Sequence, residues 1–354
     1  LVLSRTAHAA FHKAAYYFDL KLVVVDFDET TYKADVEAMR AAVNDNTILL
    51  IASAPNYSHG IVDPVLEIAA MAAERGILCH VDACIGGFQL AFMRQLGFEV
   101  PPFDFAVSGV TSVSADLHKY GYAAKGASIL LHRDKELRRF QIYANLSTTA
   151  YAITNTTLPS TKSGGPLAAA WAILHYLGRE GYLKIVAEVT AATERLLEGI
   201  NKIPDLAVLG QPDMCIFAIE AETVNAFQLA DVMKQKGWYL QPQFSKSSSL
   251  RPNIHLTITQ ATVPHIDTLL TDLEAAVAET RQLPVLDTAV VKEQVDSLLG
   301  SLSVDEAAQA LYQLAGIEGS KLPEDTAFIN TVLNVLPPPV AEQLLVDYFN
   351  DLYV

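Results

Sequence analysis

Short apolar segments that alternate with helical segments are the feature that most constrains the fold of this chain. Runs of β-branched and aliphatic residues stand at 22–25, 47–53, 77–81 and 128–131. Helical patterns lie between them at 35–42, 64–75 and after residue 87, and a short helix capped by Thr6 is expected over 6–17. Pro64 suits the first turn of a helix, and Gly76 suits a helix end. Near-continuous apolar strands separated by helices are typical of parallel sheets buried on both faces, so the sequence predicts an α/β fold.

Three parts are expected along the 354 residues. Residues 1–165 contain the alternating pattern and are predicted to be a large ligand-binding domain. From 166 onward, long helical segments at 166–178 and 182–200 precede a second set of short strands, one of them expected at 238–241. This pattern predicts a smaller α+β domain over 166–283. After Pro284 the chain becomes helical and acidic, so residues 284–354 are expected to form a helical tail.

Charge and composition exclude several classes of protein. The formal net charge of −15 argues against a nucleic-acid-binding surface or one that binds anionic membranes. No apolar run is long enough to span a bilayer, and the first residues lack the pattern of a signal peptide. The chain opens on Leu1 inside a predicted strand, so we expect that an upstream portion is missing.

The chain holds three cysteines, Cys79, Cys84 and Cys215, all embedded in apolar runs. A small, odd number of cysteines favours a reducing cytosol over a disulfide framework. The spacing of Cys79 and Cys84 does not match a zinc site, so no metal is expected. A cysteine-dependent enzyme built on Cys84 lacks a matched base in the sequence.

The stretch from Thr111 to Gly126 carries the strongest indication of chemistry. Small and hydroxyl residues lead into His118-Lys119, and a glycine-punctuated aromatic turn with a second lysine, Lys125, follows. Crowding by small residues and aromatics would disfavour the ammonium form of a lysine, and a neutral amine can attack a carbonyl to form a Schiff base. The alternative for an isolated His-Lys pair is a solvated lysine on a surface turn.

Asp82 directly follows the predicted buried strand at 77–81. Ligands of parallel sheets bind beyond the carboxyl ends of the strands, where Asn56, Asp82 and the His118-Lys119 loop are all expected. Pyridoxal phosphate requires an acid as well as a lysine, because a carboxylate beside the pyridine nitrogen keeps that nitrogen protonated. The alternative role of Asp82 is a helix N-cap, although Gly86-Gly87 favours a backbone that approaches something closely.

Three segments together resemble the sphingosine-1-phosphate lyases: Thr-Ala-His-Ala-Ala-Phe at 6–11, His-Val-Asp-Ala-Cys-Ile-Gly-Gly-Phe at 80–88, and the stretch at 112–126. The loop at 53–60, followed by Asp63-Pro64, also resembles a loop of these enzymes. They belong to the pyridoxal-phosphate group II decarboxylase family, which has the aspartate-aminotransferase-like fold of type I. The resemblance covers roughly residues 1–281. It implies a mostly parallel sheet flanked by helices, a smaller α+β domain and a helical tail.

The resemblance also implies roles for individual residues. Lys119 would hold the cofactor as a Schiff base, Asp82 would bind its pyridine nitrogen, and His8 would stack on its ring. His118 would help to bind the cofactor phosphate, with a structural hydrogen bond as the alternative. Lys125 would hold the substrate phosphate or assist removal of the C3 hydroxyl proton. Amino-acid decarboxylases generally lack the Tyr-Gly-Tyr-Ala-x-Lys-Gly segment that contains this second lysine.

Other residues are further candidates for contacts with the substrate or with the cofactor phosphate. Tyr57 and His59 are expected in the substrate pocket. Near 160–165 the family usually carries Gly-Ser-Arg-x-Gly-Gly, whose serine reaches the cofactor phosphate of the neighbouring subunit. Here Thr161 keeps a hydroxyl and Lys162 keeps a charge, without the planar fork of arginine. Leu117 also departs from the usual threonine.

Family members carry a Gly-Gly-Thr-Glu-Ser phosphate cradle upstream of the segments quoted above. A glycine-rich segment at a helix N-terminus is a common kind of anion site. This chain begins after the point where the cradle should end, so we interpret it as a fragment.

The reaction implied by the resemblance is a retro-aldol cleavage of a phosphorylated sphingoid base, such as sphingosine 1-phosphate, to a long-chain aldehyde and phosphoethanolamine. The implied assembly is a homodimer with a shared active site, without nucleic acid and without a membrane span in this chain. The resemblance further implies a cytoplasmic-facing protein that is soluble as given, since eukaryotic relatives are anchored in the endoplasmic reticulum by a segment absent here.

Two other functions stay open. An amino-acid decarboxylase that uses pyridoxal phosphate would need the same Asp82 and Lys119, but Lys125 argues against it. A non-catalytic relative or an inactive fragment is favoured by the missing phosphate cradle.

Overall fold

The computed structural model describes residues 1–149, 151–159, 161–245, 250–301, 310–313, 316 and 323–352. The chain forms two compact units. The first contains residues 1–193, 210–217 and 258–261, and the second contains 194–209, 218–257 and 262–354. The division into domains at 165 and 283 stays a prediction.

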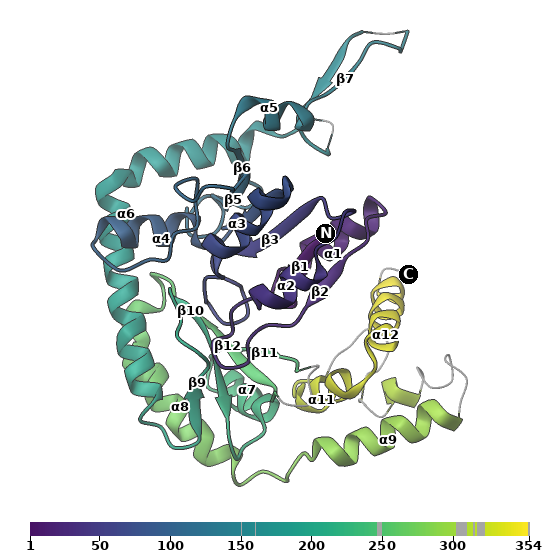
Figure 1. Ribbon diagram of the computed structural model, residues 1–354. Helices are drawn as coiled ribbons and strands as arrows, with labels where there is room; N and C mark the ends of the chain where they lie inside the picture. The colour runs from purple at the N-terminus through teal and green to yellow at the C-terminus, as the bar shows by residue number, and fades with distance from the viewer. Residues whose placement is uncertain are drawn as a thin grey trace. The chain divides into compact units, whose positions relative to one another are not determined.

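A mostly parallel sheet forms the centre of the first unit (Figure 1). Within the described residues its strands are β1 (Val2–Ser4), β2 (Val23–Val25), β3 (Leu49–Ser53), β4 (Leu78–Asp82), β5 (Ser112–Asp116) and β6 (Ser128–His132). The strand order is β2-β1-β3-β4-β5-β6, and all neighbours whose register is defined run parallel except β5 and β6. The predicted α/β fold is therefore confirmed.

Helices alternate with the strands of this sheet along the chain. They are α1 (Ala10–Tyr17), α2 (Val36–Ala42), α3 (Val65–Arg75) and α4 (Gly86–Gln95). α2 packs on β1 and β2, α3 on β3 and β4, and α4 on β5. Asp35 caps α2 by accepting a hydrogen bond from the Ala38 amide, and Gly76 ends α3 in the left-handed conformation, as expected.

The predicted cap of the first helix was wrong. α1 begins at Ala10 rather than at residue 7, and its N-cap position is Ala9. The Thr6 hydroxyl instead bonds the buried Ser4 hydroxyl at 2.9 Å, so it is not available to the helix amides. The Thr6–Ala9 segment is consequently a turn between β1 and α1.

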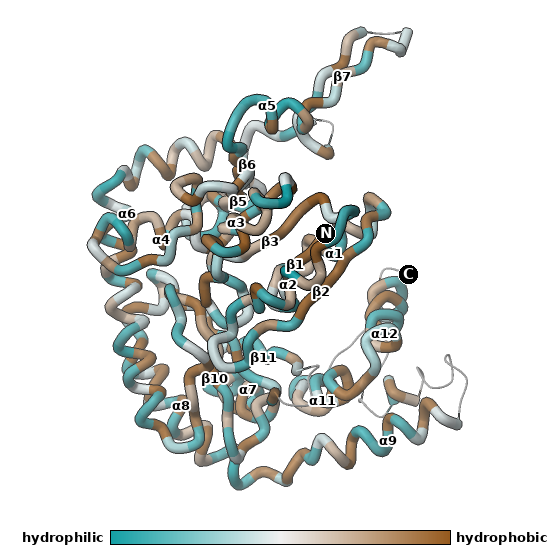
Figure 2. Tube along the Cα trace, viewed as in Figure 1, coloured by the Kyte–Doolittle hydropathy of each residue, from teal (hydrophilic) through white to brown (hydrophobic). Residues whose placement is uncertain are grey.

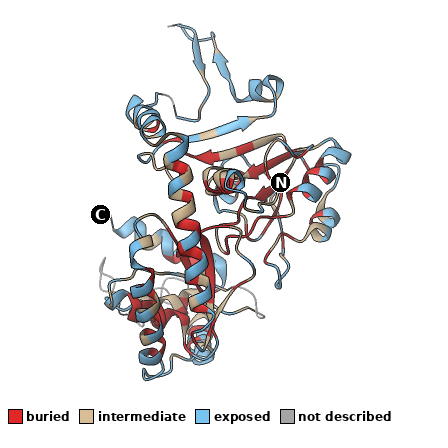
Figure 3. Cartoon of the chain, turned by 90° about the vertical axis from the view of Figure 1, so that its left-hand side faces the viewer, coloured by how far each residue is buried: buried red, intermediate tan, exposed pale blue. Residues whose placement is uncertain are grey.

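The burial of the central strands follows their sequence. Figure 2 shows β1, β2 and β3 as hydrophobic segments, and Figure 3 shows buried residues along the sheet. The last four residues of β3 and the middle three of β4 are fully buried, whereas β6 at the edge is largely exposed. Strands covered on both faces have no room for an alternating polar face, which explains their continuous apolar runs.

A hairpin that the sequence analysis did not anticipate extends away from this sheet (Figure 1). After β6 come the short helix α5 (Lys135–Arg138), a 3₁₀ turn (Arg139–Gln141) and the paired strands β7 (Tyr143–Asn145) and β8 (Ile153–Asn155). The long helix α6 (Gly164–Ile200) follows and is interrupted at Gly178, where φ is 56°. This break separates the two helices predicted at 166–178 and 182–200.

The second unit contains its own sheet, with the strand order β11-β12-β10-β9. The strands are β9 (Leu206–Val208), β10 (Ile216–Ala221), β11 (Gln241–Gln243) and β12 (Asn253–Thr257), and the helices are α7 (Ala226–Gln235) and α8 (Ile266–Thr280). The strand predicted at 238–241 is shifted to 241–243. The α+β character predicted for this part agrees with the structure.

The C-terminal region of the second unit is helical, as expected. It contains α9 (Thr288–Ser301), α11 (Ala327–Val335) and α12 (Pro338–Asp351), which share an apolar core that includes Val295, Val332 and Leu344. Asp231 on α7 accepts hydrogen bonds from the backbone amides of Thr326 and Ala327 at the start of α11, at 2.8 and 2.7 Å. In the part of the chain that the structure describes, no helix combines the length and apolar character needed to cross a membrane.

The loop from Ala54 to Asp63 is held tightly against the first unit. The buried Asp63 carboxylate accepts hydrogen bonds from the Ser53 amide at 2.7 Å and the Ala34 amide at 3.0 Å. Gly60 adopts a φ of 74°, and a Cβ atom built there would lie 1.8 Å from the carbonyl oxygen of Ile216. Both its conformation and its surroundings therefore require glycine.

We predict that Gly60→Ala lowers the free energy of unfolding by about 3 kcal/mol or more, because a left-handed conformation and a backbone clash add together. Gly76→Ala is the matched control: its φ of 67° is similar, but no atom lies within 4 Å of the added Cβ. The control should lose only about 1 kcal/mol. Urea denaturation followed by circular dichroism measures both, and equal losses would contradict the contact with Ile216.

Candidate active site

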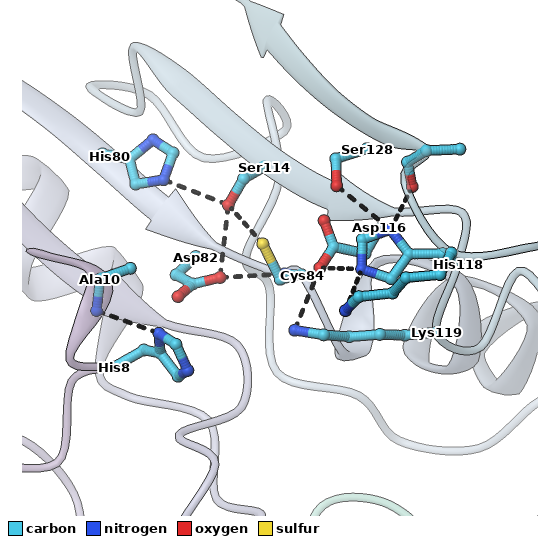
Figure 4. A network of polar contacts seen from close by, with 12 residues as sticks. His8, Ala10, His80, Asp82, Cys84, Ser114, Asp116, His118, Lys119 and Ser128 are labelled. Carbon is cyan, nitrogen blue, oxygen red and sulfur yellow. Dashed lines mark hydrogen bonds and ion pairs between the residues drawn. The ribbon is translucent and has the colours of Figure 1, made fainter. Parts of the chain in front are cut away.

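The register of the parallel strands places four candidate segments at one edge of the sheet. Ser53 at the end of β3 pairs with Asp82 at the end of β4, and Asp82 pairs with Ser114 on β5. His8, Tyr57 and Lys119 lie in the segments that follow the carboxyl ends of β1, β3 and β5, and Asp82 is the last residue of β4. Figure 4 shows His8 and Lys119 extending from different segments toward the side where the Asp82 carboxylate lies.

Hydrogen bonds fix the Asp82 carboxylate. Its Oδ1 accepts from the Cys84 amide at 3.0 Å and from the Ser114 hydroxyl at 3.3 Å. The first bond closes a local turn, and α4 does not begin until Gly86, so Asp82 is not the N-cap of that helix. The second bond ties the carboxylate to the neighbouring strand. Asp82 is therefore a preoriented acceptor at the strand end.

His80, two residues before Asp82 on β4, contacts the same hydrogen-bond network. Its Nδ1 lies 2.9 Å from the Ser112 hydroxyl and its Nε2 lies 3.2 Å from the Ser114 hydroxyl. Burial lowers the pKa of His80, and the attraction of Asp82 opposes this shift only in part. The imidazole is thus neutral near pH 7, and it orients the hydroxyl that contacts Asp82.

Two glycines allow α4 to approach the sheet. A Cβ atom at Gly86 would lie 2.2 Å from the carbonyl oxygen of Ala54, and one at Gly87 would lie 2.8 Å from the Cβ of Ala115. The close approach expected from Gly86-Gly87 is therefore a contact between the helix and the strands. Cys84, just before them, has a pKa raised by burial and by the charge of Asp82, so its thiol stays protonated.

Lys119 forms an ion pair that the sequence analysis missed. Its Nζ lies 3.0 Å from Oδ2 of Asp116, the last residue of β5. The Lys119 side chain is 33% exposed, so the expectation of an amine crowded by apolar groups was wrong. The signal was present in the sequence, because an acid three residues before the lysine falls at the same strand end.

Asp116 is buried, with its side chain 9% exposed. Burial alone would raise its pKa, but a hydrogen bond from Ser128 and the positive charges around it outweigh burial and lower the pKa below the usual value. The cation neighbours are Lys119 and, when protonated, His118, whose Nε2 lies 3.6 Å from Asp116 Oδ2. Asp116 is therefore ionised.

His118 joins Lys125 to this cluster. Its Nδ1 lies 2.6 Å from the carbonyl oxygen of Ala127, which can only accept, so Nδ1 carries the hydrogen. In the neutral ring Nε2 is then an acceptor, and it lies 3.2 Å from Lys125 Nζ. The structural hydrogen bond that was considered for His118 is present, and it leaves the other ring nitrogen facing the second lysine.

Aromatic hydroxyls anchor the turn that carries both lysines. Tyr182 donates to the carbonyl oxygen of Gly121 at 2.6 Å, and Tyr120 donates to that of Ile258 at 3.3 Å. Tyr122 adopts a φ of 58°, which is unusual for a residue with a Cβ atom. These contacts hold the backbone between Lys119 and Lys125 in a tight reversal.

His8 lies in the turn before α1 and is exposed. Its Nδ1 accepts a hydrogen bond from the Ala10 amide at 3.1 Å, so the hydrogen of the neutral ring is on Nε2. The turn thus fixes the ring orientation while leaving a face of the imidazole accessible at the sheet edge (Figure 4).

The further candidates for contacts with the substrate or with the cofactor phosphate lie in different surroundings. Tyr57 is half-buried, and His59 is buried against the rings of Tyr32 and Phe27. Thr161 and Lys162 are exposed just before α6, and the preceding Ser160 lies outside the described residues. The structure therefore brings Lys119, His118 and Lys125 into one cluster and places Asp82 and His8 at the same edge.

Comparison with known proteins agrees with the resemblance described from the sequence. The pyridoxal-dependent decarboxylase conserved domain matches residues 1–219, and a pyridoxal-dependent enzyme C-terminal putative HTH domain matches residues 271–351. Sphingosine-1-phosphate lyase of Arabidopsis thaliana is 42% identical over 285 residues, which cover 80% of this chain and 51% of that protein. The chain spans about half the length of the curated lyases that it matches.

Two further relatives are a lyase of known structure and a probable decarboxylase. A solved structure of a sphingosine-1-phosphate lyase from Burkholderia pseudomallei has a TM-score of 0.75 and 35% identity, covering 79% of this chain and 63% of that one. A probable L-tyrosine/L-aspartate decarboxylase of Methanothermobacter thermautotrophicus is 32% identical, covering 77% of this chain and 73% of that protein.

Proposed function

The chain belongs to the pyridoxal-dependent decarboxylase family, and we propose that it acts in a lyase that cleaves the C2–C3 bond of a phosphorylated sphingoid base. The products would be a long-chain aldehyde and phosphoethanolamine. The observation that carries this proposal is the second lysine, Lys125, held 3.2 Å from His118 in the turn after Lys119. The relatives named sphingosine-1-phosphate lyase support the same choice within the family.

The residues at the sheet edge fit pyridoxal phosphate, the cofactor of this family. An amine, a preoriented carboxylate and an accessible imidazole are what its aldehyde, its pyridine nitrogen and its ring face require. Lys119, Asp82 and His8 supply these groups from the carboxyl ends of β5, β4 and β1, which lie at one edge of the sheet. When bound, the cofactor provides an electron sink for the bond that breaks.

Each residue would have a distinct task. Asp82 would keep the proton on the pyridine nitrogen, because its carboxylate is fixed by Cys84 and Ser114. Lys119 would hold the cofactor through its amine, and His8 would orient the ring. Lys125 would contact the substrate phosphate or, with His118 Nε2 as its neighbour, accept the proton of the C3 hydroxyl. Thr161 and Lys162 would add phosphate contacts, and Tyr57 and His59 would shape the substrate pocket.

An amino-acid decarboxylase is the second candidate function. The similarity to the probable decarboxylase of Methanothermobacter favours it, because that protein is covered more fully than the lyases are. The same Asp82 and Lys119 would serve a decarboxylase, whereas a carboxylate leaving as carbon dioxide needs no second lysine. The two functions differ in their products, namely carbon dioxide or an aldehyde.

We also propose that two copies of this chain form a homodimer. The hairpin and the first half of α6 expose large apolar side chains, among them Phe140, Leu146, Leu158, Trp171 and Tyr176. Side chains of this size are rarely left in water over a contiguous region of a monomer. A second copy would cover them, and it would bring a neighbouring Thr161 and Lys162 to the shared site.

We further propose that the chain has no nucleic-acid partner and that it works in a reducing compartment facing the cytoplasm. The segment 271–351 carries fourteen acidic residues and three Lys or Arg, so electrostatics oppose nucleic-acid binding by the C-terminal region. All three cysteines lie within the described residues and are free, which supports a reducing, cytoplasmic-facing compartment.

Lys125→Ala is predicted to lower the yield of long-chain aldehyde from sphingosine 1-phosphate by about 100-fold, the scale of a lost proton-transfer group. The protein should still bind pyridoxal phosphate. Lys135→Ala, at an exposed lysine on α5, is the control and should keep full activity. Aldehyde and carbon dioxide are measured in the same reaction. Carbon dioxide from an amino acid, with no aldehyde from the lipid, would instead favour the decarboxylase.

For the assembly, Phe140→Asp combined with Leu146→Asp should convert a dimer to a monomer in sedimentation velocity, because charges replace the apolar contacts of the hairpin. Leu66→Asp, at an exposed position of α3, is the control and should remain dimeric. A monomeric wild-type protein, or a hairpin variant that still dimerises, would overturn this interface.

A further inference from the structure

Ser114 lies at the centre of a set of hydrogen bonds around Asp82 (Figure 4). Its hydroxyl donates to Asp82 Oδ1 at 3.3 Å, because a carboxylate oxygen can only accept. The Cys84 thiol lies 3.3 Å from the same Ser114 oxygen, and His80 Nε2 lies 3.2 Å from it. Since the one hydrogen of this hydroxyl is directed at Asp82, both of these neighbours donate to its two lone pairs. Every hydrogen-bonding position of Ser114 Oγ is therefore occupied.

The direction of these bonds also defines the tautomer of His80. A neutral ring that donates through Nε2 has its lone pair on Nδ1, which then accepts from the Ser112 hydroxyl at 2.9 Å. The Cys84 side chain donates as a thiol, because burial and the charge of Asp82 raise its pKa. Ser114 cannot turn its hydrogen toward His80 or Cys84, since each of them already presents a hydrogen. The bonds thus run in one direction and end on the Asp82 carboxylate.

The two carboxylate oxygens of Asp82 are in different situations. Oδ1 accepts from the Cys84 amide at 3.0 Å and from Ser114, whereas Oδ2 has no hydrogen-bond donor within the part of the chain that the structure describes. The Cys84 amide belongs to the same local turn as Asp82. Ser114 lies on β5, 32 residues further along the chain, and β5 pairs with β4 in parallel register. Ser114 is therefore the contact that fixes the carboxylate relative to the neighbouring strand.

We infer that Ser114 is a positioning residue for Asp82: it holds Oδ1 and thereby presents Oδ2 to the pyridine nitrogen of the cofactor. This inference rests on the proposed role of Asp82 as the partner of that nitrogen. The terminal torsion of an aspartate side chain is broad, so a free carboxylate can exchange its two oxygens. A bond from the next strand to one oxygen restricts the side chain to one orientation before the cofactor binds, and such preorganisation improves affinity.

The test compares two aldehydes on the full chain: pyridoxal phosphate and its deaza analogue, in which a carbon atom replaces the pyridine nitrogen. Isothermal titration calorimetry gives the dissociation constant of each. A residue that acts through the pyridine nitrogen strengthens binding of the first aldehyde alone, so the ratio of the two constants isolates its contribution. Ser114→Ala should reduce the preference for pyridoxal phosphate about tenfold, the scale of losing an outer hydrogen bond to a ligating group. Affinity for the analogue should stay close to that of the wild type.

Variants on the same strand separate positioning from a structural effect. Ser114→Thr keeps the hydroxyl, suits a β-strand and should restore the preference. Ser112→Ala removes a hydroxyl from the same His80 ring without a contact to Asp82, and it should keep the preference of the wild type. Circular dichroism checks that each variant is folded. If Ser114→Ala is not folded, Ser114→Cys supplies the test, because a thiol is a weaker donor and should lower the preference in part.

The inference is overturned if Ser114→Ala keeps the wild-type preference while Asp82→Asn loses it, since the role of Asp82 would then not depend on Ser114. It is also overturned if Ser114→Ala weakens both aldehydes equally, if Ser114→Thr behaves like Ser114→Ala, or if Ser112→Ala loses as much preference. A preference that is absent from the wild type, or kept in Asp82→Asn, would overturn the role of Asp82 and the inference with it. No turnover is measured, so these results are distinct from failure of the lyase activity, which the aldehyde assay detects.

Discussion

The parallel register of β1, β3, β4 and β5 is the constraint on which the site depends. Because these strands run in one direction, the segments that follow them meet at a single edge, although they are separated by up to about a hundred residues in sequence. The shared edge places His8, Asp82 and Lys119 on the same side of the sheet. Ser114 and His80, which fix the Asp82 carboxylate, also belong to the strands, so this part of the site rests on rigid elements.

Acid residues have two different roles at this edge. Asp82 is held by hydrogen bonds from a backbone amide and a hydroxyl, which leaves its charge available to a ligand. The charge of Asp116 is instead directed at Lys119 within the chain itself. One carboxylate is thus suited to the cofactor ring and the other to the lysine that would hold it. The turn between Lys119 and Lys125, anchored by Tyr182, holds Lys125 3.2 Å from His118.

The sequence predicted the sheet well because its signals are local: apolar strand runs, the helical pattern at 35–42 and the helix end at Gly76. Asp82, His118 and Lys119 were found through motif resemblance and strand-end position. The missed features depend on which of several nearby partners a side chain takes. Thr6 bonds Ser4, two residues before it, instead of capping α1, and Lys119 pairs with Asp116, three residues before it. The hairpin at β7 and β8 lacks the apolar alternation that predicts a strand.

The central claim is that Lys119 is the residue that binds pyridoxal phosphate covalently, beside Asp82. The most direct measurement is to incubate the full chain with the cofactor, reduce it with borohydride, and map the modified peptide by mass spectrometry. The account predicts a stable adduct on Lys119 that is lost in Lys119→Ala. An adduct on Lys125 or on another lysine, or equal modification of Lys119→Ala, would contradict it.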